Sequence, residues 1–348
     1  MKNIDNPYKQ ILVTGGAGFI GSNFILYMIK KYPKIKIVNL DKLTYAGNLD
    51  NLKSIEKDPC YKFVHGDICS PSDVKRAMRG VDCVVHFAAE SHVDRSISGP
   101  AIFVQTNVIG TQVLLDSARE LQVKHFHHVS TDEVFGSLPL DNKNQKFSEK
   151  TPYDPRSPYS ASKAASDHIV RAYAETYGLP ITISNCTNNY GPYHFPEKVI
   201  PLFITNALKN KPLPIYGKGR AIRDYLFVKD HCSAIDLILS RGKAGETYCV
   251  GGDSERNTIE VADAILKILG KDKNLKTFVE DRKGHDMRYA MDHKKITREL
   301  GWKPSVSFEG GLEQTIEWFK KNEPWWQRII SGKYLDLSRA AQNRNENK

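Results

Sequence analysis

Short apolar runs alternate with amphipathic stretches of helical length through the first half of the chain. The apolar runs, rich in β-branched residues, span 10–14, 35–40, 61–65, 81–89, 123–130 and 180–186. Amphipathic stretches lie at about 18–31, 71–79, 101–121 and 158–177. Strands that are apolar along their whole length are buried on both faces. The alternation therefore predicts an α/β fold, a doubly wound parallel sheet of the Rossmann type.

The second half of the chain has a different character, because proline and glycine become frequent and the helical stretches become shorter. We therefore expect a Rossmann domain over residues 1–187 and a smaller C-terminal α+β lobe over residues 188–348. The apolar segment ETYCVGG (246–252) predicts one more strand, near 246–251, that returns to the main sheet.

Composition places the chain among ordinary globular proteins, with 348 residues, 40% of them hydrophobic and 26% charged. The formal net charge of +10 favours an anionic partner. Lysine and arginine are scattered rather than clustered in long runs, so the charge does not indicate a nucleic-acid partner.

Two further features bear on the compartment. No apolar stretch is long enough for a transmembrane helix, and the first residues lack the basic-then-apolar layout of an export signal. The six cysteines show no Cys-x-x-Cys spacing and are expected to be reduced thiols in the core. We therefore expect a cytoplasmic protein with no membrane partner.

A glycine-rich loop, TGGAGFIGSNF (14–24), follows the first predicted strand and opens a helix. Gly15, Gly18 and Gly21 allow a tight turn, a close approach to a pyrophosphate and close helix–strand packing. The second predicted strand leads into Asp41, whose carboxylate would accept hydrogen bonds from ribose hydroxyls and repel a 2′-phosphate. The pattern predicts NAD rather than NADP, although Lys42 beside Asp41 would also suit a phosphate.

The segment SPYSASKAASDHIVRAY (157–173) predicts a helix on which Tyr159 and Lys163 are four residues apart. They therefore share one face. A lysine ammonium near a phenol favours the phenolate, which lowers the tyrosine pKa toward the range of a general base. The alternative is an ordinary amphipathic helix with an exposed lysine.

Two adjacent carboxylates, Asp132 and Glu133, follow the apolar run 123–130 within the string STDEVFG. A solvated turn is the simplest interpretation, because charged pairs are usually on the surface. The alternative is a closed site, where mutual repulsion and burial drive the two pKa values apart.

Together these motifs resemble the extended short-chain dehydrogenase/reductases, which combine a GxxGxxG loop, a Tyr-xxx-Lys pair and a smaller C-terminal lobe. Further segments are similar to the members that dehydrate nucleotide sugars: STDEVFG, FAAESHVDRS (87–96), NNYGPYHFPEK (188–198), IRDYLFV (222–228) and DRKGHDMRYAMD (281–292). The resemblance spans residues 10 to 320. It implies a hydro-lyase that acts on dTDP-glucose in a pathway to rhamnose, with internally recycled NAD and a homodimeric assembly.

The chemistry implied by the resemblance is oxidation at C4, elimination of water across C5 and C6, and return of the hydride to C6. On that pattern Tyr159 is the base at O4, Lys163 its electrostatic partner and Thr131 a hydrogen-bond donor to O4. Asp132 is the acid for the leaving hydroxyl and Glu133 the base at C5. The residues by themselves leave the division between these two carboxyl groups open.

The resemblance also implies two sets of binding residues. The cofactor set, besides the glycines and the Tyr159–Lys163 pair, is Phe19, Ile20, Asp41, Lys42, Leu43, Thr44, Asp67, Ile68, Ala88, Ala89, Ser91, Thr106 and Asn189. The nucleotide-sugar set, assigned mainly to the smaller lobe, is Ser91, Thr131, Asn188, Lys198, Val199, Pro214, Tyr216, Arg223, Asn257, Arg282 and His285. The guanidinium groups of Arg223 and Arg282 suit a diphosphate.

Other interpretations stay open at this point. The substrate could be a CDP-, GDP- or UDP-sugar, and the activity could be 4-epimerisation, which the paired carboxylates argue against. A non-catalytic NAD-binding regulator would need none of the four catalytic groups. Two departures from the family pattern, Lys283 and Phe135, replace no catalytic atom. Histidines 86, 125, 127 and 128 lie on buried-looking strands without a convergent ligand spacing, so no metal is expected.

Overall fold

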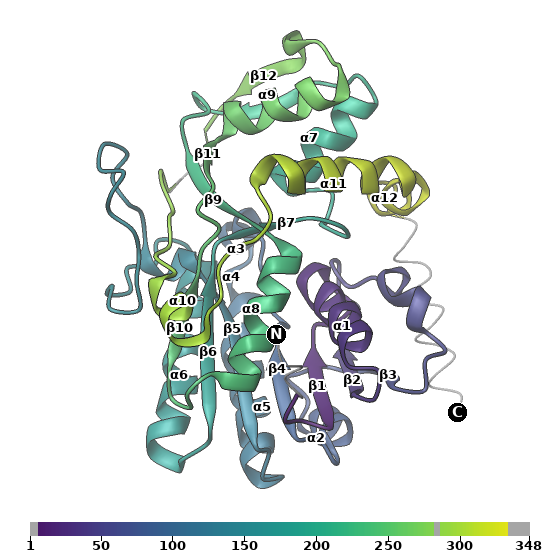
Figure 1. Cartoon of the computed structure of the whole chain (residues 1–348), viewed down its shortest axis with the longest axis vertical. Coiled ribbons are helices and arrows are strands. Elements are labelled where there is room, and N and C mark those ends of the chain that lie inside the picture. The colour runs from purple at the N-terminus through teal and green to yellow at the C-terminus, as the bar shows by residue number, and fades with distance from the viewer. Residues whose placement is uncertain (1–5, 282–285, 333–348) are drawn as a thin grey trace.

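The computed structural model describes residues 6–281 and 286–332. Its central element is a seven-stranded parallel sheet with the order β10-β6-β5-β4-β1-β2-β3 (Figure 1). The strands are β1 (Gln10–Thr14), β2 (Lys36–Asp41), β3 (Tyr61–His65), β4 (Cys83–His86), β5 (His125–Thr131), β6 (Ile181–Cys186) and β10 (Thr247–Val250). The predicted Rossmann-type fold is confirmed.

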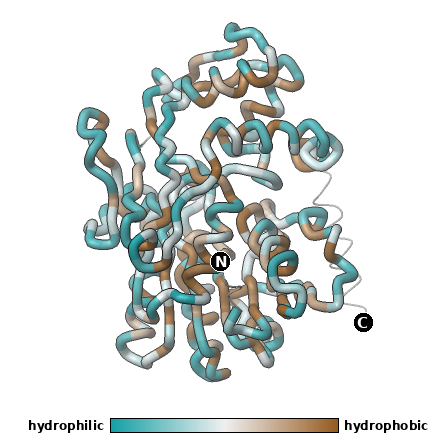
Figure 2. Tube along the Cα trace, in the orientation of Figure 1, coloured by the Kyte–Doolittle hydropathy of each residue, from teal (hydrophilic) through white to brown (hydrophobic). Residues whose placement is uncertain are grey.

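Helices cover both faces of the sheet, which explains why its strands are apolar throughout. They are α1 (Phe19–Lys31) and α8 (Val228–Arg241) on one face, and α2 (Pro71–Met78), α5 (Gly110–Glu120) and α6 (Pro158–Tyr177) on the other. In β1, Ile11 and Val13 pack with α1 and α8, whereas Leu12 between them belongs to the opposite core. Successive side chains of a strand point to opposite faces, so the strands β1, β2, β4 and β5 each contribute to both cores. Figure 2 shows the apolar segments concentrated along these elements.

Two predicted elements have different bounds in the structure. The run 81–89 is a strand only over β4, because the chain then turns toward the glycine loop, where the Ala88 amide donates to Thr14 Oγ1 at 3.3 Å. The predicted helix 101–121 is interrupted by a π-helical turn, η2 (Val104–Ile109), between α4 (Pro100–Phe103) and α5.

The smaller lobe lies above the carboxyl ends of the main strands (Figure 1). It contains a three-stranded sheet, β11-β9-β7, and a two-stranded one, β12-β8. The strands are β7 (Asn188–Tyr190), β8 (Leu213–Tyr216), β9 (Ile222–Phe227), β11 (Glu255–Asn257) and β12 (Lys276–Val279). The helices are α7 (Val199–Leu208), α9 (Thr258–Leu269), α11 (Phe308–Lys321) and α12 (Glu323–Ile330). Their buried faces form a separate hydrophobic core.

The chain passes between the two lobes more than once. After β7, α8 and β10 return to the main sheet, and α10 (Lys294–Leu300) packs beside β10. The division of the chain at residue 188 stays a prediction, and these three elements lie beyond it in sequence but with the first lobe in space. The remaining short helices are η1 (Leu49–Ile55), α3 (Val93–Ser98), η3 (Asp132–Phe135) and η4 (Lys273–Leu275).

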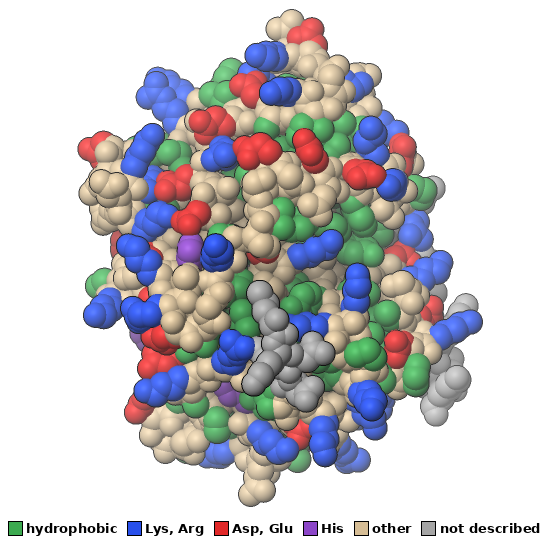
Figure 3. Space-filling model, viewed as in Figure 1, with side chains coloured by type: hydrophobic (Ala, Val, Ile, Leu, Met, Phe, Trp, Pro, Cys, Tyr) green, Lys and Arg blue, Asp and Glu red, His purple; other side chains and the backbone are tan. Residues whose placement is uncertain are grey.

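The molecular surface carries charges of both signs. On the face shown in Figure 3, lysine and arginine side chains are dispersed among acidic ones. Within residues 6–281 and 286–332, no helix combines the length and the apolar character needed to cross a membrane.

Candidate active site

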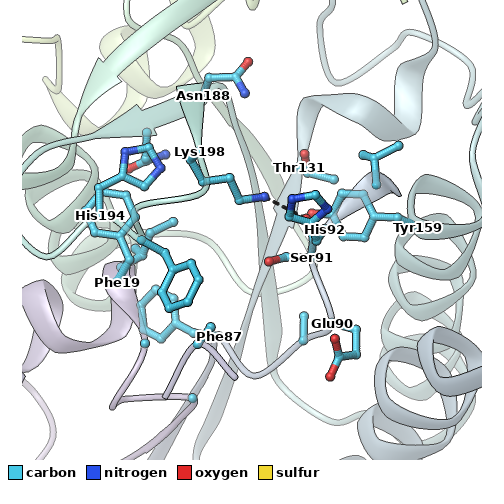
Figure 4. A pocket seen from close by; sticks show the side chains of 18 of the residues that line it. Phe19, Phe87, Glu90, Ser91, His92, Thr131, Tyr159, Asn188, His194 and Lys198 are labelled. Carbon is cyan, nitrogen blue, oxygen red and sulfur yellow. Dashed lines mark hydrogen bonds between the residues drawn. The ribbon is translucent and has the colours of Figure 1, made fainter. Parts of the chain in front are cut away.

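A cavity of about 520 Å³ opens at the carboxyl ends of the central strands. One wall consists of segments that follow β1, β2, β4 and β5, and the opposite wall comes from the chain after β7 and from β8 and β9. The order of the strands reverses at β1, whose neighbours are β2 and β4, and doubly wound folds bind ligands at such a switch point. Figure 4 shows side chains from both walls pointing into this space.

The glycine loop is packed too tightly for side chains. Gly15 has a φ of +70°, and a Cβ there would lie 2.6 Å from the Ala88 amide nitrogen. A Cβ on Gly21 would lie 2.4 Å from the Gly15 carbonyl oxygen. Helix α1 starts after Gly18 with no side-chain cap and no acidic residue in its first turn. Its first amides are therefore suited to a pyrophosphate.

Asp41 ends β2 at the edge of the cavity. Its two carboxylate oxygens accept hydrogen bonds from the amides of Ala17 and Leu43, at 2.9 and 2.8 Å. Burial raises the pKa of Asp41, and these two hydrogen bonds oppose that rise. Each oxygen keeps a second lone pair, which suits a ribose hydroxyl. Lys42, which the sequence left ambiguous, pairs with Asp67 at 2.7 Å.

The acidic pair lies in η3, at the end of β5. Asp132 is only 1% exposed, so the solvated-turn interpretation is wrong for this residue. Its Oδ1 accepts a hydrogen bond from Thr131 Oγ1 at 3.1 Å, and its Oδ2 has no partner in the described part of the chain. Burial, and then the charge of Glu133, raises the pKa of Asp132 well above its usual value. The raised pKa favours the protonated form, which a proton donor requires.

Helix α6 presents Tyr159 in its first turn. Ser157 and Ser160 form a reciprocal capping box, and Pro158 occupies the first helical position, so the helix starts at a defined residue. Tyr159 lines the cavity, and Figure 4 shows it beside Thr131. Burial, and then the charge of Glu133, raises the pKa of Tyr159, whereas a hydrogen bond with Thr131 lowers it.

The pKa of Tyr159 is raised overall, and the expectation that Lys163 lowers it stays a prediction. The Lys163 ammonium lies one turn further along α6 and donates to the Val129 carbonyl at 2.8 Å. Burial lowers the pKa of Lys163 itself, and the nearby Asp167 partly offsets this effect. Both Tyr159 and Lys163 nevertheless line the same cavity.

Most of the predicted site residues meet around this cavity. All five predicted catalytic residues line it, as do every predicted cofactor residue except Leu43 and eight of the predicted substrate residues: Ser91, Thr131, Asn188, Lys198, Val199, Pro214, Tyr216 and Arg223. Their individual roles stay predictions.

Four predicted residues are not placed at the cavity. The Leu43 side chain is buried, and the backbone amide of this residue donates a hydrogen bond to the Asp41 carboxylate. The Asn257 side chain caps α9, and it is the next residue, Thr258, that lines the cavity. Arg282 and His285 lie outside the described residues, as does Lys283.

The structure also adds cavity residues that the sequence did not predict. His194, from the chain after β7, stacks on Phe19 of the glycine loop with ring centroids 4.4 Å apart (Figure 4). Glu197 pairs with Arg95 at 3.2 Å and lies 3.6 Å from His92. These contacts join segments about 100 or more residues apart, so no local pattern could reveal them. Among the added residues are Tyr45, Glu90, His92, His194, Phe195, Glu197 and Tyr289.

The buried histidines of the strands hydrogen-bond to hydroxyl groups. His86 contacts Thr14 and Thr111, at 2.7 and 3.0 Å, and His125 and His127 both contact Thr182 at 2.8 Å. Burial lowers the pKa of His125 to about 4, which keeps the ring neutral. No cluster of three or more His, Cys, Asp or Glu side chains suited to a metal ion occurs within 6–281 and 286–332.

Comparison with known proteins identifies the family. The family model described as GDP-mannose 4,6 dehydratase matches residues 12–315, and the chain belongs to this family. A dTDP-glucose 4,6-dehydratase of Salmonella typhimurium is 50% identical, over 93% of this chain and 96% of the relative. One of Xanthomonas campestris is 52% identical, with the same coverage of each chain. The resemblance to nucleotide-sugar dehydratases is thereby confirmed.

Solved structures support the same family assignment. DesIV, a dTDP-glucose 4,6-dehydratase of Streptomyces venezuelae solved with NAD bound, superposes with a TM-score of 0.89 at 50% identity, covering 92% of this chain and 99% of its own. A UDP-glucose 4-epimerase of Thermotoga maritima gives a TM-score of 0.83 at 30% identity, covering 90% of this chain and 99% of its own. The fold is therefore shared with epimerases, and the catalytic side chains must distinguish the two activities.

A glycine substitution tests the cofactor loop. We expect Gly15→Ala to weaken NAD binding by roughly ten-fold or more, because the left-handed backbone costs about 1–2 kcal/mol and the methyl group meets Ala88. Isothermal titration calorimetry with NAD measures the effect. The matched control is Gly178→Ala, since Gly178 has a φ of +68° but nothing within 4 Å of an added Cβ. It should lower thermal stability and leave NAD affinity unchanged; equal affinities for both variants would contradict the assignment.

Proposed function

We propose that this chain is a dTDP-glucose 4,6-dehydratase that converts dTDP-glucose to dTDP-4-keto-6-deoxyglucose and water. The observation that carries the proposal is the buried Asp132 beside Glu133, in one cavity with Tyr159 and Lys163. Curated dTDP-glucose 4,6-dehydratases about half identical over nearly the whole chain support the same activity. The glycine loop, the uncapped start of α1 and Asp41 fit NAD as cofactor.

Oxidation at C4 begins with removal of the proton from the glucose 4-hydroxyl. Tyr159 is the base at this oxygen, and Thr131, beside it, holds the hydroxyl by a hydrogen bond. Burial raises the pKa of the phenol, so Tyr159 depends on a positive charge nearby when it accepts the proton. Lys163 supplies that charge from the next turn of α6. NAD, when bound, accepts the C4 hydride and later returns it to C6.

Elimination across C5 and C6 needs a base and an acid on one sugar. The new 4-ketone acidifies the C5 proton, and Glu133 removes it. Asp132 protonates the departing 6-hydroxyl, which leaves as water. A protonated acid beside an ionised base is the arrangement that the burial of Asp132 and the charge of Glu133 favour. The structure thus offers a physical reason for giving the acid role to Asp132.

The nucleotide diphosphate is assigned to the smaller lobe. Arg223 donates to the carbonyls of Ile222 and Asp286, at 2.9 and 3.0 Å, and its guanidinium lies over the Tyr289 ring at 4.3 Å. These contacts hold its charge at the cavity wall, where it can meet a diphosphate. Lys198 reaches across the cavity to the Ser91 carbonyl at 3.2 Å, a position suited to a second anionic contact (Figure 4).

A 4-epimerase is the closest rival activity, because the fold is shared. Epimerisation at C4 requires oxidation and reduction of that carbon, but no acid–base pair for C5 and C6. The buried Asp132 beside Glu133 therefore favours dehydration. Another nucleotide sugar as substrate and a non-catalytic NAD-binding regulator are the remaining alternatives.

We also propose a homodimer in the cytoplasm that serves rhamnose synthesis. Apolar side chains on α3, α4 and η2 are unusually exposed, among them Ile97, Ile102 and Val104 at 48, 47 and 51%. Leu121, just after α5, and Tyr177 on α6 continue this exposure, which supports a contact between helices of two copies. All six cysteines are free thiols, which supports a reducing compartment.

Turnover of dTDP-glucose in deuterated water tests the activity. We expect a 4-keto-6-deoxy sugar with deuterium at C5 and no net NADH, detected by mass spectrometry and NMR. Glu133→Gln should lower the rate by roughly 10²–10⁴-fold, because the C5 base is lost. Glu317→Gln, which removes an exposed carboxylate on α11, is the control and should retain wild-type activity. Turnover of a CDP- or UDP-sugar instead would support the mechanism but contradict the assignment of a thymidine nucleotide to the substrate. No turnover with any sugar would favour a non-catalytic NAD-binding regulator.

A charge on the exposed helical face tests the assembly. We expect Val104→Asp to convert a dimer to a monomer, because it buries a carboxylate in the proposed contact. Size-exclusion chromatography with light scattering gives the mass. Leu140→Asp, at a residue that is 37% exposed outside these helices, should remain dimeric. A wild-type monomer, or a dimeric Val104→Asp protein, would rule out this interface.

A further inference from the structure

Asp167 is a buried carboxylate for which the proposed chemistry has no step. It lies on α6, one turn beyond Lys163, and its side chain is fully buried. It does not line the cavity. An ionisable group so far from solvent is costly unless hydrogen bonds and an opposite charge compensate for its burial.

The hydrogen bonds of Asp167 reach β5, which carries Thr131, as well as β6 and the chain that precedes α6. Its Oδ2 accepts hydrogen bonds from Ser130 Oγ and Tyr153 OH, both at 2.8 Å. Ser130 directly precedes Thr131 on β5. Asn185 of β6 donates to the same Oδ2 at 3.4 Å and to the Thr131 carbonyl at 3.1 Å. One carboxylate thus ties α6 to the end of β5.

The charge of Asp167 matters as much as its hydrogen bonds, because the Lys163 ammonium is also buried. The titratable and charged groups around this pair are His86 on β4, His128 on β5, Tyr153 before α6, Cys186 on β6 and Arg171 on α6. His128 Nε2 lies 3.1 Å from Asp167 Oδ1 and 3.4 Å from Lys163 Nζ. The pKa of His128 is lowered to about 4, so this ring is neutral at physiological pH. Burial raises the pKa of the Cys186 thiol to about 12, so it is neutral as well.

Lys163 and Asp167 are a buried cation and a buried carboxylate that lie close to the same ring nitrogen, His128 Nε2. Burial lowers the pKa of Lys163, and Asp167 is the first group that raises it again. Burial by itself would raise the pKa of Asp167, but His128, Lys163 and Ser130 together hold it below its usual value, so the carboxylate is ionised.

We propose that Asp167 is a positioning residue, the buried counter-ion that keeps Lys163 charged beside Tyr159 and fixes the end of β5 that carries Thr131 and Asp132. The role of Lys163 in this statement rests on the dehydratase function proposed above. The pairing of the two buried charges does not, and it can be tested without any substrate.

Asp167→Asn keeps the size of the side chain and removes its charge. The ammonium of Lys163 then loses its proton at lower pH, so the alkaline limb of the profile of kcat/KM against pH should move down by about one unit, a roughly ten-fold change. Tyr153→Phe removes one hydrogen bond and leaves the charge in place, and it should keep the wild-type limb.

The matched control for a purely structural role is Asp236→Asn. Asp236 is also fully buried, and it accepts hydrogen bonds from Tyr27, Tyr32 and the Lys31 ammonium, between α1 and α8 and away from the cavity. Its substitution should lower thermal stability and leave the pH limb in place. A folded Asp167→Asn enzyme with an unmoved limb would overturn the proposal.

A stability cycle covers the case in which Asp167→Asn does not fold. Lys163→Met removes the other buried charge, and the double variant leaves neither charge uncompensated. We expect the double variant to be at least as stable toward urea as Asp167→Asn alone, because the cost of a lone buried ammonium disappears. Strictly additive losses would refute the pairing, whether or not the protein turns over dTDP-glucose.

Discussion

The cost of burying charge governs the architecture of the site. The parallel sheet places Asp132, Lys163 and Asp167 where each side chain is almost fully buried, and each of these groups must be neutralised, paired or hydrogen-bonded. The raised pKa of Asp132 favours its protonated form, whereas Lys163 and Asp167 both lie close to His128 Nε2. The same strand end can therefore hold an acid that needs its proton and a cation that must keep its charge.

The two lobes are joined by packing as well as by the chain. His194 stacks on Phe19, and Asn23 of α1 donates to the Pro192 carbonyl at 2.9 Å. Trp325 of α12 donates to Asn51, which in turn donates to the Ala17 carbonyl in the glycine loop. Three sets of contacts thus connect the segment 14–24 to the smaller lobe.

Much of the fold could be predicted because its signals are local. The β-branched runs gave the strands of the first half, and Ser157-Pro158 marks the start of α6 at the predicted residue. The shortened β4 and the π-helical turn could not be predicted, because they depend on Thr14 of another strand and on Asn107, which bonds to Ser162 of α6. At the site, the motifs located residues that the fold brings together around one cavity, and their catalytic roles stay predictions. Glu197, Tyr289 and the counter-ion Asp167 carry no such signal, because their meaning comes from partners distant in sequence.

The path of the chain through both lobes has a consequence for biosynthesis. Strand β6 pairs with β5 on one side and with β10 on the other, and α8 covers the face that contains Ile11 and Val13. A nascent chain that ends near residue 187 would present β6 as an open edge and leave one face of β1 uncovered, a template for pairing with other chains. The N-terminal half is therefore not a self-sufficient folding unit. The main sheet and its helical cover can be completed only after residues 228–250 have left the ribosome. A chaperone that prevents aggregation of this protein should therefore be needed during that interval.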